Sequence, residues 1–145
     1  MTQEKALQES TELYKKPKHG EFCWVELASN NIEACKPFYT ELFGWHISTS
    51  TSVPGIDYTE FGVNEKVRSG SMFQMNEQWH DASNKKFDSH WGIYIAVDDV
   101  DAVAAKIENL GGKVCVPPTD IPNTGRFCVI NDPSGATISM ITLSD

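Results

Sequence analysis

The sequence lacks several features that would assign it to particular classes of protein. No apolar run approaches the length of a membrane span, and the first twenty residues are polar, without the apolar core of a signal peptide. The four cysteines include no CxxC pair, and their spacing is typical of isolated core residues. We therefore expect a cytoplasmic protein with reduced thiols and no membrane partner.

Basic residues are also scarce. The chain of 145 residues has 12 lysines and arginines against 20 aspartates and glutamates, which gives a net charge of −8. Nucleic-acid binding requires a basic surface, and the one lysine cluster, at residues 15–18, has the composition of a solvated linker. The charge balance argues against a nucleic-acid partner, and the length fits one domain with its own core.

A half-buried strand followed by a helix is the first recognisable unit. Residues 21–29 alternate between two faces, which predicts a half-buried strand with Cys23, Val25 and Leu27 on one face and Phe22, Trp24 and Glu26 on the other. Residues 30–44 follow with apolar residues at helical spacing, Asn30 at the expected N-cap and Gly44 at the expected stop. Pro37 lies inside this pattern, so we expect it to kink or divide the helix.

The same pattern occurs a second time. A constant offset of 68 positions relates three pairs, namely Asn30 and Asp98, Leu42 and Leu110, and Gly44 and Gly112. Extended without gaps, the offset matches residues 57–73 with residues 125–141, so each half reads as strand, helix and three strands. This repeat predicts an α+β domain of two βαβββ modules related by a pseudo-twofold axis, with the helices on the outer faces of the sheets.

We expect three parts in the chain. Residues 1–20 form an N-terminal arm, and residues 21–143 form a single domain. The domain consists of modules 21–75 and 90–143, which are joined by a polar linker at residues 76–89.

Three blocks of the sequence resemble the vicinal-oxygen-chelate superfamily, which includes glyoxalase I, extradiol dioxygenases and bleomycin resistance proteins. The blocks are FYTELFGW, VDDVDAVAAKIENLGGKV and GRFCVINDPSGATISMI, and their order and spacing agree with the family over about residues 21–143. The resemblance implies that the two modules curl into a cup, which in the family commonly holds a divalent metal, and that the protein is a homodimer. It leaves the activity open, because this fold serves lyases, epimerases, dioxygenases and pure binders.

The resemblance places the metal-ligand positions of the family at Trp24, Ser71, Gly92 and Ser139. Indole has no free lone pair, glycine has no side chain, and serine is rarely a metal ligand. We therefore expect neither a metal nor another cofactor at this place. The alternative is a displaced metal site on the linker, formed by His80, Asp81, Asp88 and His90, although their spacing matches no known template.

Period-two alternation from these positions predicts an aromatic cup with few polar groups. The third strands are taken to add Tyr58, Glu60, Arg126 and Cys128. The predicted ligand-binding residues are Trp24, Tyr58, Glu60, Ser71, Phe73, Tyr94, Arg126 and Ser139. A mostly apolar surface with sparse polar groups is typical of a small-molecule site, but the same aromatic residues could simply fill the cup as core.

Glu26 is the predicted catalytic residue. A carboxylate beside an indole on an inward face would be desolvated, and the resulting rise in its pKa suits a general acid or base. The alternative role is an ion pair with Arg126 or another cation that joins the two half-sheets. Cys128 could be a nucleophile, but no histidine is placed to activate it, and a buried inert thiol is favoured.

These observations favour a metal-independent small-molecule binding protein of the glyoxalase and bleomycin-resistance type, in which an aromatic or amphipathic ligand stacks in the cup. The alternative is a glyoxalase-like lyase, isomerase or hydroxylase that uses Glu26 as acid or base, or a noncanonical metal site. In a third hypothesis the cup is filled and the protein acts as a scaffold or regulator. The sequence leaves open whether the protein is an enzyme.

Overall fold

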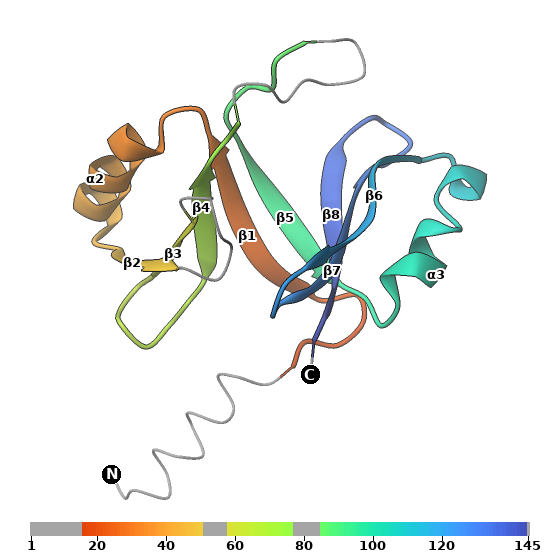
Figure 1. The fold of residues 1–145 in the computed structure, drawn as a ribbon, viewed down its shortest axis with the longest axis horizontal. Helices are drawn as coiled ribbons and strands as arrows, with labels where there is room; N and C mark the ends of the chain where they lie inside the picture. Colours follow the sequence, from red (N-terminus) through yellow and green to blue (C-terminus); the bar gives the residue numbers. More distant parts are fainter. Residues whose placement is uncertain (1–15, 51–57, 77–84, 145) are drawn as a thin grey trace, which may run out of the picture.

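The computed structural model describes residues 16–50, 58–76 and 85–144. In these ranges one open eight-stranded sheet carries helices on its two outer flanks (Figure 1), and the strand order is β2-β3-β4-β1-β5-β8-β7-β6. The predicted α+β fold is confirmed. Residues 1–15 of the predicted arm and residues 77–84 of the predicted linker lie outside the described residues.

Each half of the chain forms the predicted strand, helix and three strands. The first module consists of β1 (Phe22–Ser29), α2 (Ile32–Phe43), β2 (His46–Ser50), β3 (Tyr58–Gly62) and β4 (Gly70–Gln74). The second consists of β5 (His90–Ala96), α3 (Val100–Ala104), a short 3-10 helix (Glu108–Leu110), β6 (Lys113–Ile121), β7 (Gly125–Asn131) and β8 (Thr137–Leu143).

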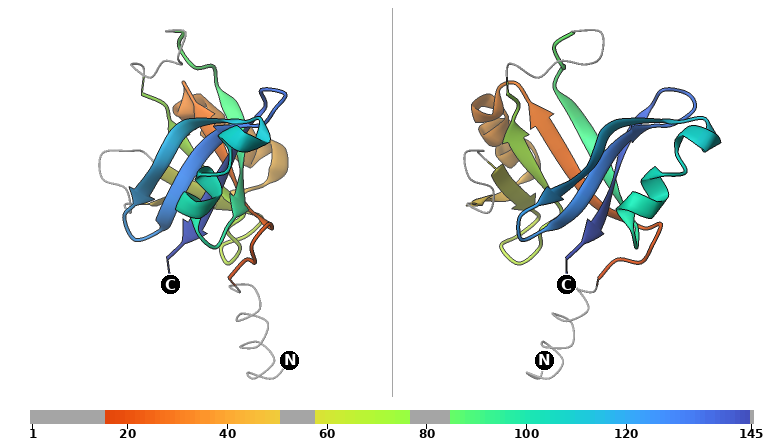
Figure 2. Two further views of the ribbon diagram at one scale, coloured as in Figure 1. Left: turned by 90° about the vertical axis from the view of Figure 1, so that its right-hand side faces the viewer. Right: turned by 45° about the vertical axis from the view of Figure 1, so that its right-hand side comes forward.

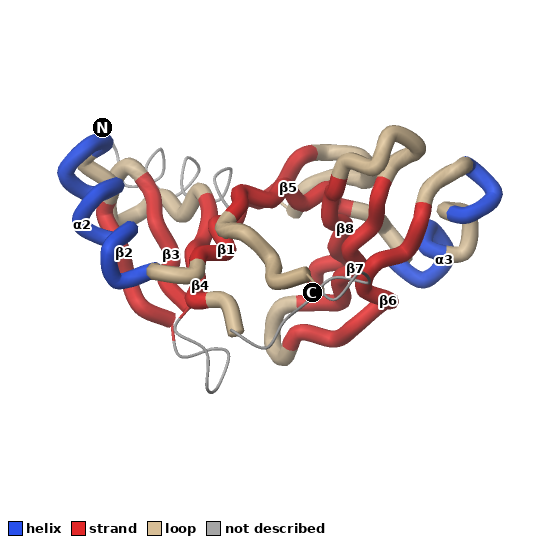
Figure 3. Tube along the Cα trace, turned by 90° about the horizontal axis from the view of Figure 1, so that it is seen from above, coloured by secondary structure: helices blue, strands red, loops and turns tan. Residues whose placement is uncertain are grey.

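The two modules join through their first strands. β1 pairs antiparallel with β5, and each of these strands also pairs in parallel with the last strand of its own module, β4 or β8. The two halves of the sheet bend away from this central pair (Figure 2) and face each other, with α2 and α3 on the far sides (Figure 3). We call the side turned away from the helices the cup face and the other side the helix face.

Both helices begin one residue later than predicted, and the offset of 68 is preserved. The N-caps are Asn31 and Asp99, whose side chains accept hydrogen bonds from backbone amides of the first turn. The predicted caps, Asn30 and Asp98, are therefore wrong by one position. Gly44 ends α2 in the left-handed conformation with φ 72°, as expected for a glycine stop.

The helix α2 runs without interruption from Ile32 to Phe43 and contains Pro37. The expectation that this proline divides the helix is wrong. Its missing N–H would have bonded the carbonyl of Glu33, and both residues are exposed, so water can take the place of the lost donor. Among the described residues, neither this helix nor any other has the length and apolar character that crossing a membrane would need.

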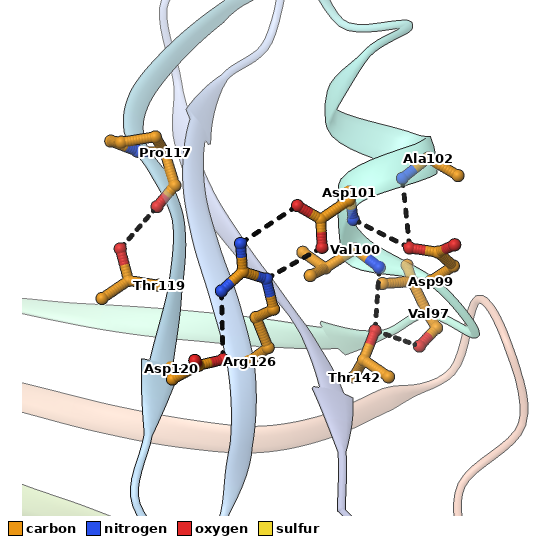
Figure 4. Close-up of polar contacts among 10 residues, drawn as sticks. All are labelled: Val97, Asp99, Val100, Asp101, Ala102, Pro117, Thr119, Asp120, Arg126 and Thr142. Atoms are coloured by element: carbon orange, nitrogen blue, oxygen red, sulfur yellow. Dashed lines mark hydrogen bonds and ion pairs between the residues drawn. The ribbon is translucent and has the colours of Figure 1, made fainter.

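A polar side chain of the last strand anchors the start of the helix in each module. The amide of Ile32 donates to Gln74 Oε1 at 2.9 Å, and the amide of Val100 donates to Thr142 Oγ1 at 2.9 Å (Figure 4). These bonds satisfy amides that a helix leaves free in its first turn. They fix both helices to equivalent places on the sheet.

Two apolar clusters lie between the helices and the sheet. The first contains Leu27, Ile32, Phe61 and Met72, and the second contains Val97, Val100, Cys128 and Met140. Leu27 therefore lies beneath the helix, as its place in the alternating first strand predicts. The neighbouring residues of the same strand are left for the cup face.

Candidate functional site

Strand pairing brings five predicted site residues together at the middle of the cup face. Trp24 lies opposite Tyr94 across the β1–β5 pair, and Glu26 lies beside Ser71 of β4. Ser139 of β8 lies beside Tyr94. Because paired residues share a face of the sheet, these side chains converge from four strands of both modules.

Four of these side chains form one continuous chain of hydrogen bonds. Trp24 Nε1 donates to Ser71 Oγ at 2.8 Å, and Ser71 Oγ donates to Glu26 Oε2 at 3.1 Å. The Tyr94 hydroxyl donates to Glu26 Oε1 at 3.0 Å. Hydroxyl donors thus hold both oxygens of the carboxylate. We call these four residues the Glu26 network.

The network places a carboxylate in a desolvated environment. Burial raises the pKa of Glu26, and hydrogen bonds to Tyr94, Ser71 and Tyr58 offset part of the rise. Burial also raises the pKa of both tyrosines above 10, so their hydroxyls remain neutral donors at neutral pH. The arrangement can hold or exchange a proton at Glu26 and can present hydrogen-bonding groups to a ligand.

The raised pKa of Glu26 predicts a specific dependence of stability on pH. Above pH 4.5, the ordinary value for glutamate, the folded state holds this proton more tightly than the unfolded state. Stability is therefore lost as the pH rises from 4.5 through the folded pKa. We expect Glu26→Gln to remove this loss, so that the variant gains stability relative to the unaltered chain as the pH rises. Urea denaturation at a series of pH values measures the difference, and a difference that is constant with pH would contradict the raised pKa.

The strand β3 contributes Tyr58 and Glu60, which lie opposite Phe73 and Ser71 and therefore share the cup face. Glu60 Oε2 lies 3.5 Å from Nε of Arg68, and both side chains are about one-third exposed or less. Arg68 is not among the site residues that the sequence predicts. It lies in the connection between β3 and β4, outside any alternating pattern, so only the path of that connection reveals its contact with Glu60.

The strand β7 has the opposite register from the predicted one. Arg126 lies opposite Thr142 and Cys128 opposite Met140, so both are on the helix face. In the first module Glu60 lies opposite Ser71, whereas in the second the residue opposite Ser139 is Val129. Equivalent third-strand positions are therefore 69 apart, and this slip of one residue exchanges the two faces. Phe127 and Val129 take the cup-face places expected for Arg126 and Cys128.

Arg126 consequently forms ion pairs away from the cup. Its guanidinium bonds Asp101 of α3 at 2.8 and 3.1 Å and Asp120 of β6 at 3.0 Å (Figure 4). The proposed ion pair between Arg126 and Glu26 is therefore wrong. Cys128 is fully buried in the second apolar cluster, and burial raises the pKa of its thiol. This supports the interpretation of Cys128 as an inert core residue.

The donor groups at the middle of the cup face do not fit a divalent transition metal. The positions implied by the family resemblance hold an indole, a glycine and two serines, and the nearby carboxylate of Glu26 already accepts two hydroxyl hydrogen bonds. Transition metals in proteins bind imidazole, thiolate or carboxylate groups. Within the described parts of the chain, no group of three or more His, Cys, Asp or Glu residues could hold a metal ion.

Two of the four residues considered for a displaced metal site on the linker, Asp88 and His90, are among the described residues. His90 opens β5, and its Nδ1 lies 2.7 Å from the backbone carbonyl oxygen of Asp88. This contact uses a ring nitrogen and no carboxylate. The other two candidates, His80 and Asp81, lie outside the described residues.

Comparisons with known proteins agree with this fold. The model of the Glyoxalase/Bleomycin resistance protein/Dioxygenase superfamily matches residues 22–140. The anthracycline biosynthesis protein DnrV of Streptomyces peucetius is 35% identical over 128 residues, which are 83% of this chain and 46% of that protein. The chain thus spans about half the length of this relative.

Solved structures of methylmalonyl-CoA epimerases share the fold. The enzyme from Mycobacterium tuberculosis aligns with a TM-score of 0.57 and 14% identity, covering 92% of this chain and 96% of that one. A Streptomyces coelicolor epimerase variant aligns with a TM-score of 0.59 and 19% identity, covering 88% and 99%. At such identities the likeness extends to the fold alone.

Proposed function

The chain belongs to the Glyoxalase/Bleomycin resistance protein/Dioxygenase superfamily, and we propose that within it this domain binds a small aromatic molecule on the cup face without a metal. The proposal rests on one observation. At the place where the family resemblance implies metal ligands, the Glu26 network links an indole, a hydroxyl, a carboxylate and a phenol by hydrogen bonds.

The character of the cup face supports an aromatic ligand. Trp24, Tyr58, Tyr94 and Phe73 are partly exposed there, together with Phe127 of the second module. Aromatic rings offer large apolar contact areas with little conformational freedom to lose, and a few polar groups among them orient a ligand. The name of the Streptomyces peucetius relative refers to anthracycline biosynthesis, which agrees with a small-molecule ligand.

Calorimetric titration with acridone tests this function. Acridone is a neutral, planar, three-ring compound with one carbonyl group, so it can stack on the aromatic side chains and accept one hydrogen bond. We expect saturable binding of one molecule per chain to protein dialysed against a chelator. Failure of both acridone and its positively charged analogue 9-aminoacridine to bind would contradict the proposal.

Arg126 provides a test of which face binds the ligand. Because its guanidinium pairs with Asp101 and Asp120 on the helix face, we expect Arg126→Gln to leave the acridone affinity unchanged within about twofold, the range of a surface substitution far from a site. The affinity is measured by the same titration. A tenfold loss would indicate that the ligand lies on the side of Arg126 and not on the cup face.

The second candidate function is an enzyme in which Glu26 is the acid or base. The raised pKa of this carboxyl favours it, and methylmalonyl-CoA epimerases share the fold. Methylmalonyl-CoA in deuterium oxide provides a direct test by NMR. The binding function predicts no protein-dependent deuterium incorporation, whereas incorporation that disappears in Glu26→Gln would favour the enzyme.

We also propose that the protein forms a homodimer and that it is cytoplasmic. Analytical ultracentrifugation of the untagged chain measures the first of these. A homodimer gives about twice the mass of the 16.2 kDa chain, and a mass of one chain at working concentration would contradict it.

A further inference from the structure

The two carboxylates on the cup face, Glu60 and Glu26, differ in whether a cation lies beside them. Glu60 has a cation beside it, because Arg68 lies 3.5 Å away. Glu26 takes part in none of the ion pairs formed among the described residues. Arg126, the cation considered as a partner of Glu26, lies on the helix face. His90 lowers the pKa of Glu26 less than any of the hydroxyl groups that hydrogen-bond to it. Among the described residues, only neutral hydroxyls donate hydrogen bonds to this carboxylate.

A carboxylate held in this way is costly when it is ionised. Removing an ion from water costs several kcal/mol, and hydroxyl donors recover only part of this cost. The rise in the pKa of Glu26 has this origin. A positive charge brought next to the carboxylate would restore the missing attraction, whereas a neutral molecule would not and a negative one would add repulsion.

The surroundings of Glu26 add a second attraction for positive charge. Trp24 and Tyr94 are hydrogen-bonded to members of the same network, and Tyr58 lies near enough to lower the pKa of Glu26. The face of an aromatic ring attracts a cation, and the attraction grows when water is excluded. The same side chains that stack on a flat molecule therefore favour a charged one over its neutral counterpart.

From these contacts we infer that the ligand is a planar aromatic molecule that carries a positive charge, with the charge beside Glu26 and the ring against Trp24. This inference rests on the proposed function and narrows it to one chemical class. It sets the domain apart from the structural neighbours crystallised with CoA compounds, because the phosphates of CoA would approach a face whose unpaired charge is negative.

Three probes with the same ring system test the inference. At neutral pH 9-aminoacridine is a cation, acridone is neutral and acridine-9-carboxylate is an anion. We expect calorimetric titration at moderate salt to show the cation binding at least about tenfold more tightly than acridone, and the carboxylate binding most weakly. Coulomb attraction at partly buried sites is large enough to produce such a ratio.

Two variants, each of which removes one carboxylate charge, show which residue causes the preference for the cation. In Glu26→Gln we expect 9-aminoacridine and acridone to bind with equal affinity. Glu33→Gln is the matched control, because Glu33 is exposed at the start of α2 on the other side of the sheet. It should keep the full preference for the cation.

The outcomes separate this inference from the proposed function. If none of the probes binds, the proposed function fails. If acridone and 9-aminoacridine bind the unaltered chain equally well, the function stands and the inference is wrong. If the preference for 9-aminoacridine persists in Glu26→Gln but decreases in Glu33→Gln, its cause is the overall acidity of the chain. This result would also overturn the inference. The comparison of probes on the unaltered chain can overturn the inference even if a variant fails to fold.

Discussion

Phe61→Ala is expected to lower the free energy of unfolding by about 3–5 kcal/mol, the usual cost of truncating a buried phenylalanine. The Phe61 ring is only 2% exposed and belongs to the apolar cluster beneath α2. It stacks on Trp45 with 4.4 Å between ring centroids and meets the edge of Trp91 at 5.9 Å. The substitution leaves a cavity that these neighbours cannot fill without giving up their own contacts. Urea or guanidinium denaturation measures the loss.

Phe43 provides the control for this prediction. Its ring also contacts Trp45, with centroids 5.1 Å apart, but its side chain lies on α2 and is 58% exposed. We expect Phe43→Ala to cost less than about 1 kcal/mol, as exposed substitutions usually do. Equal losses for the two variants would show that the cluster beneath α2 is not the core of the first module.

Trp24→Leu is expected to weaken acridone binding by about 30-fold or more, corresponding to the ~2 kcal/mol that a central tryptophan commonly contributes to an interface. Trp24 provides the largest ring of the cup face and begins the Glu26 network through its bond to Ser71. Leucine keeps an apolar side chain on β1 but removes both the stacking surface and the donor. Calorimetric titration measures the affinity, and circular dichroism confirms that the variant is folded.

Trp91→Leu is the matched control, because Trp91 lies on β5 within the same central strand pair but on the helix face. It faces Leu27 across that pair, contacts Phe61 and Trp45, and is 43% exposed. Its replacement should change stability while leaving the acridone affinity nearly unaltered. If Trp91→Leu weakened binding as strongly as Trp24→Leu, the ligand would have to bind on the helix face.

The architecture could be predicted from the sequence because the two modules repeat the same local signals for where helices and strands begin and end. A cap and an apolar helical face recur at one offset, and local chemistry decides each of them. A glycine also ends the helical segment of each module, at Gly44 and at Gly111, one residue before the expected Gly112. The alternating first strands also placed Trp24 and Glu26 correctly on the cup face, since β1 has one apolar set of side chains that must lie beneath α2. A true repeat of local signals is therefore reliable evidence for a fold.

The register of β7 could not be predicted in the same way. It depends on the length of the connection to β8, which differs by one residue from the corresponding connection in the first module. Both sets of side chains in Gly125–Asn131 are largely apolar, so their pattern does not reveal the slip. This error exchanged Arg126 and Cys128 for Phe127 and Val129.

The charge balance of the cup face likewise needed the structure. Sequence spacing identified Glu26 and offered Arg126 or another cation as its alternative partner, but it missed the contact between Arg68 and Glu60. The position of Arg126 depends on the register of β7, and the contact of Arg68 depends on the path of the connection between β3 and β4. Neither leaves a periodic signal in the sequence. Within the described ranges Glu26 has only hydroxyl partners, so the cup face keeps one negative charge without a paired cation.

Metal content together with ligand affinity tests the central claim most directly. Untagged protein is analysed for metals by mass spectrometry and titrated with acridone before and after treatment with a chelator. We expect far less than one zinc, nickel or iron per chain and the same affinity in both titrations, because the Glu26 network offers no suitable ligand set. One metal ion per chain, with binding that disappears on chelation and returns when the metal is restored, would contradict a metal-independent cup.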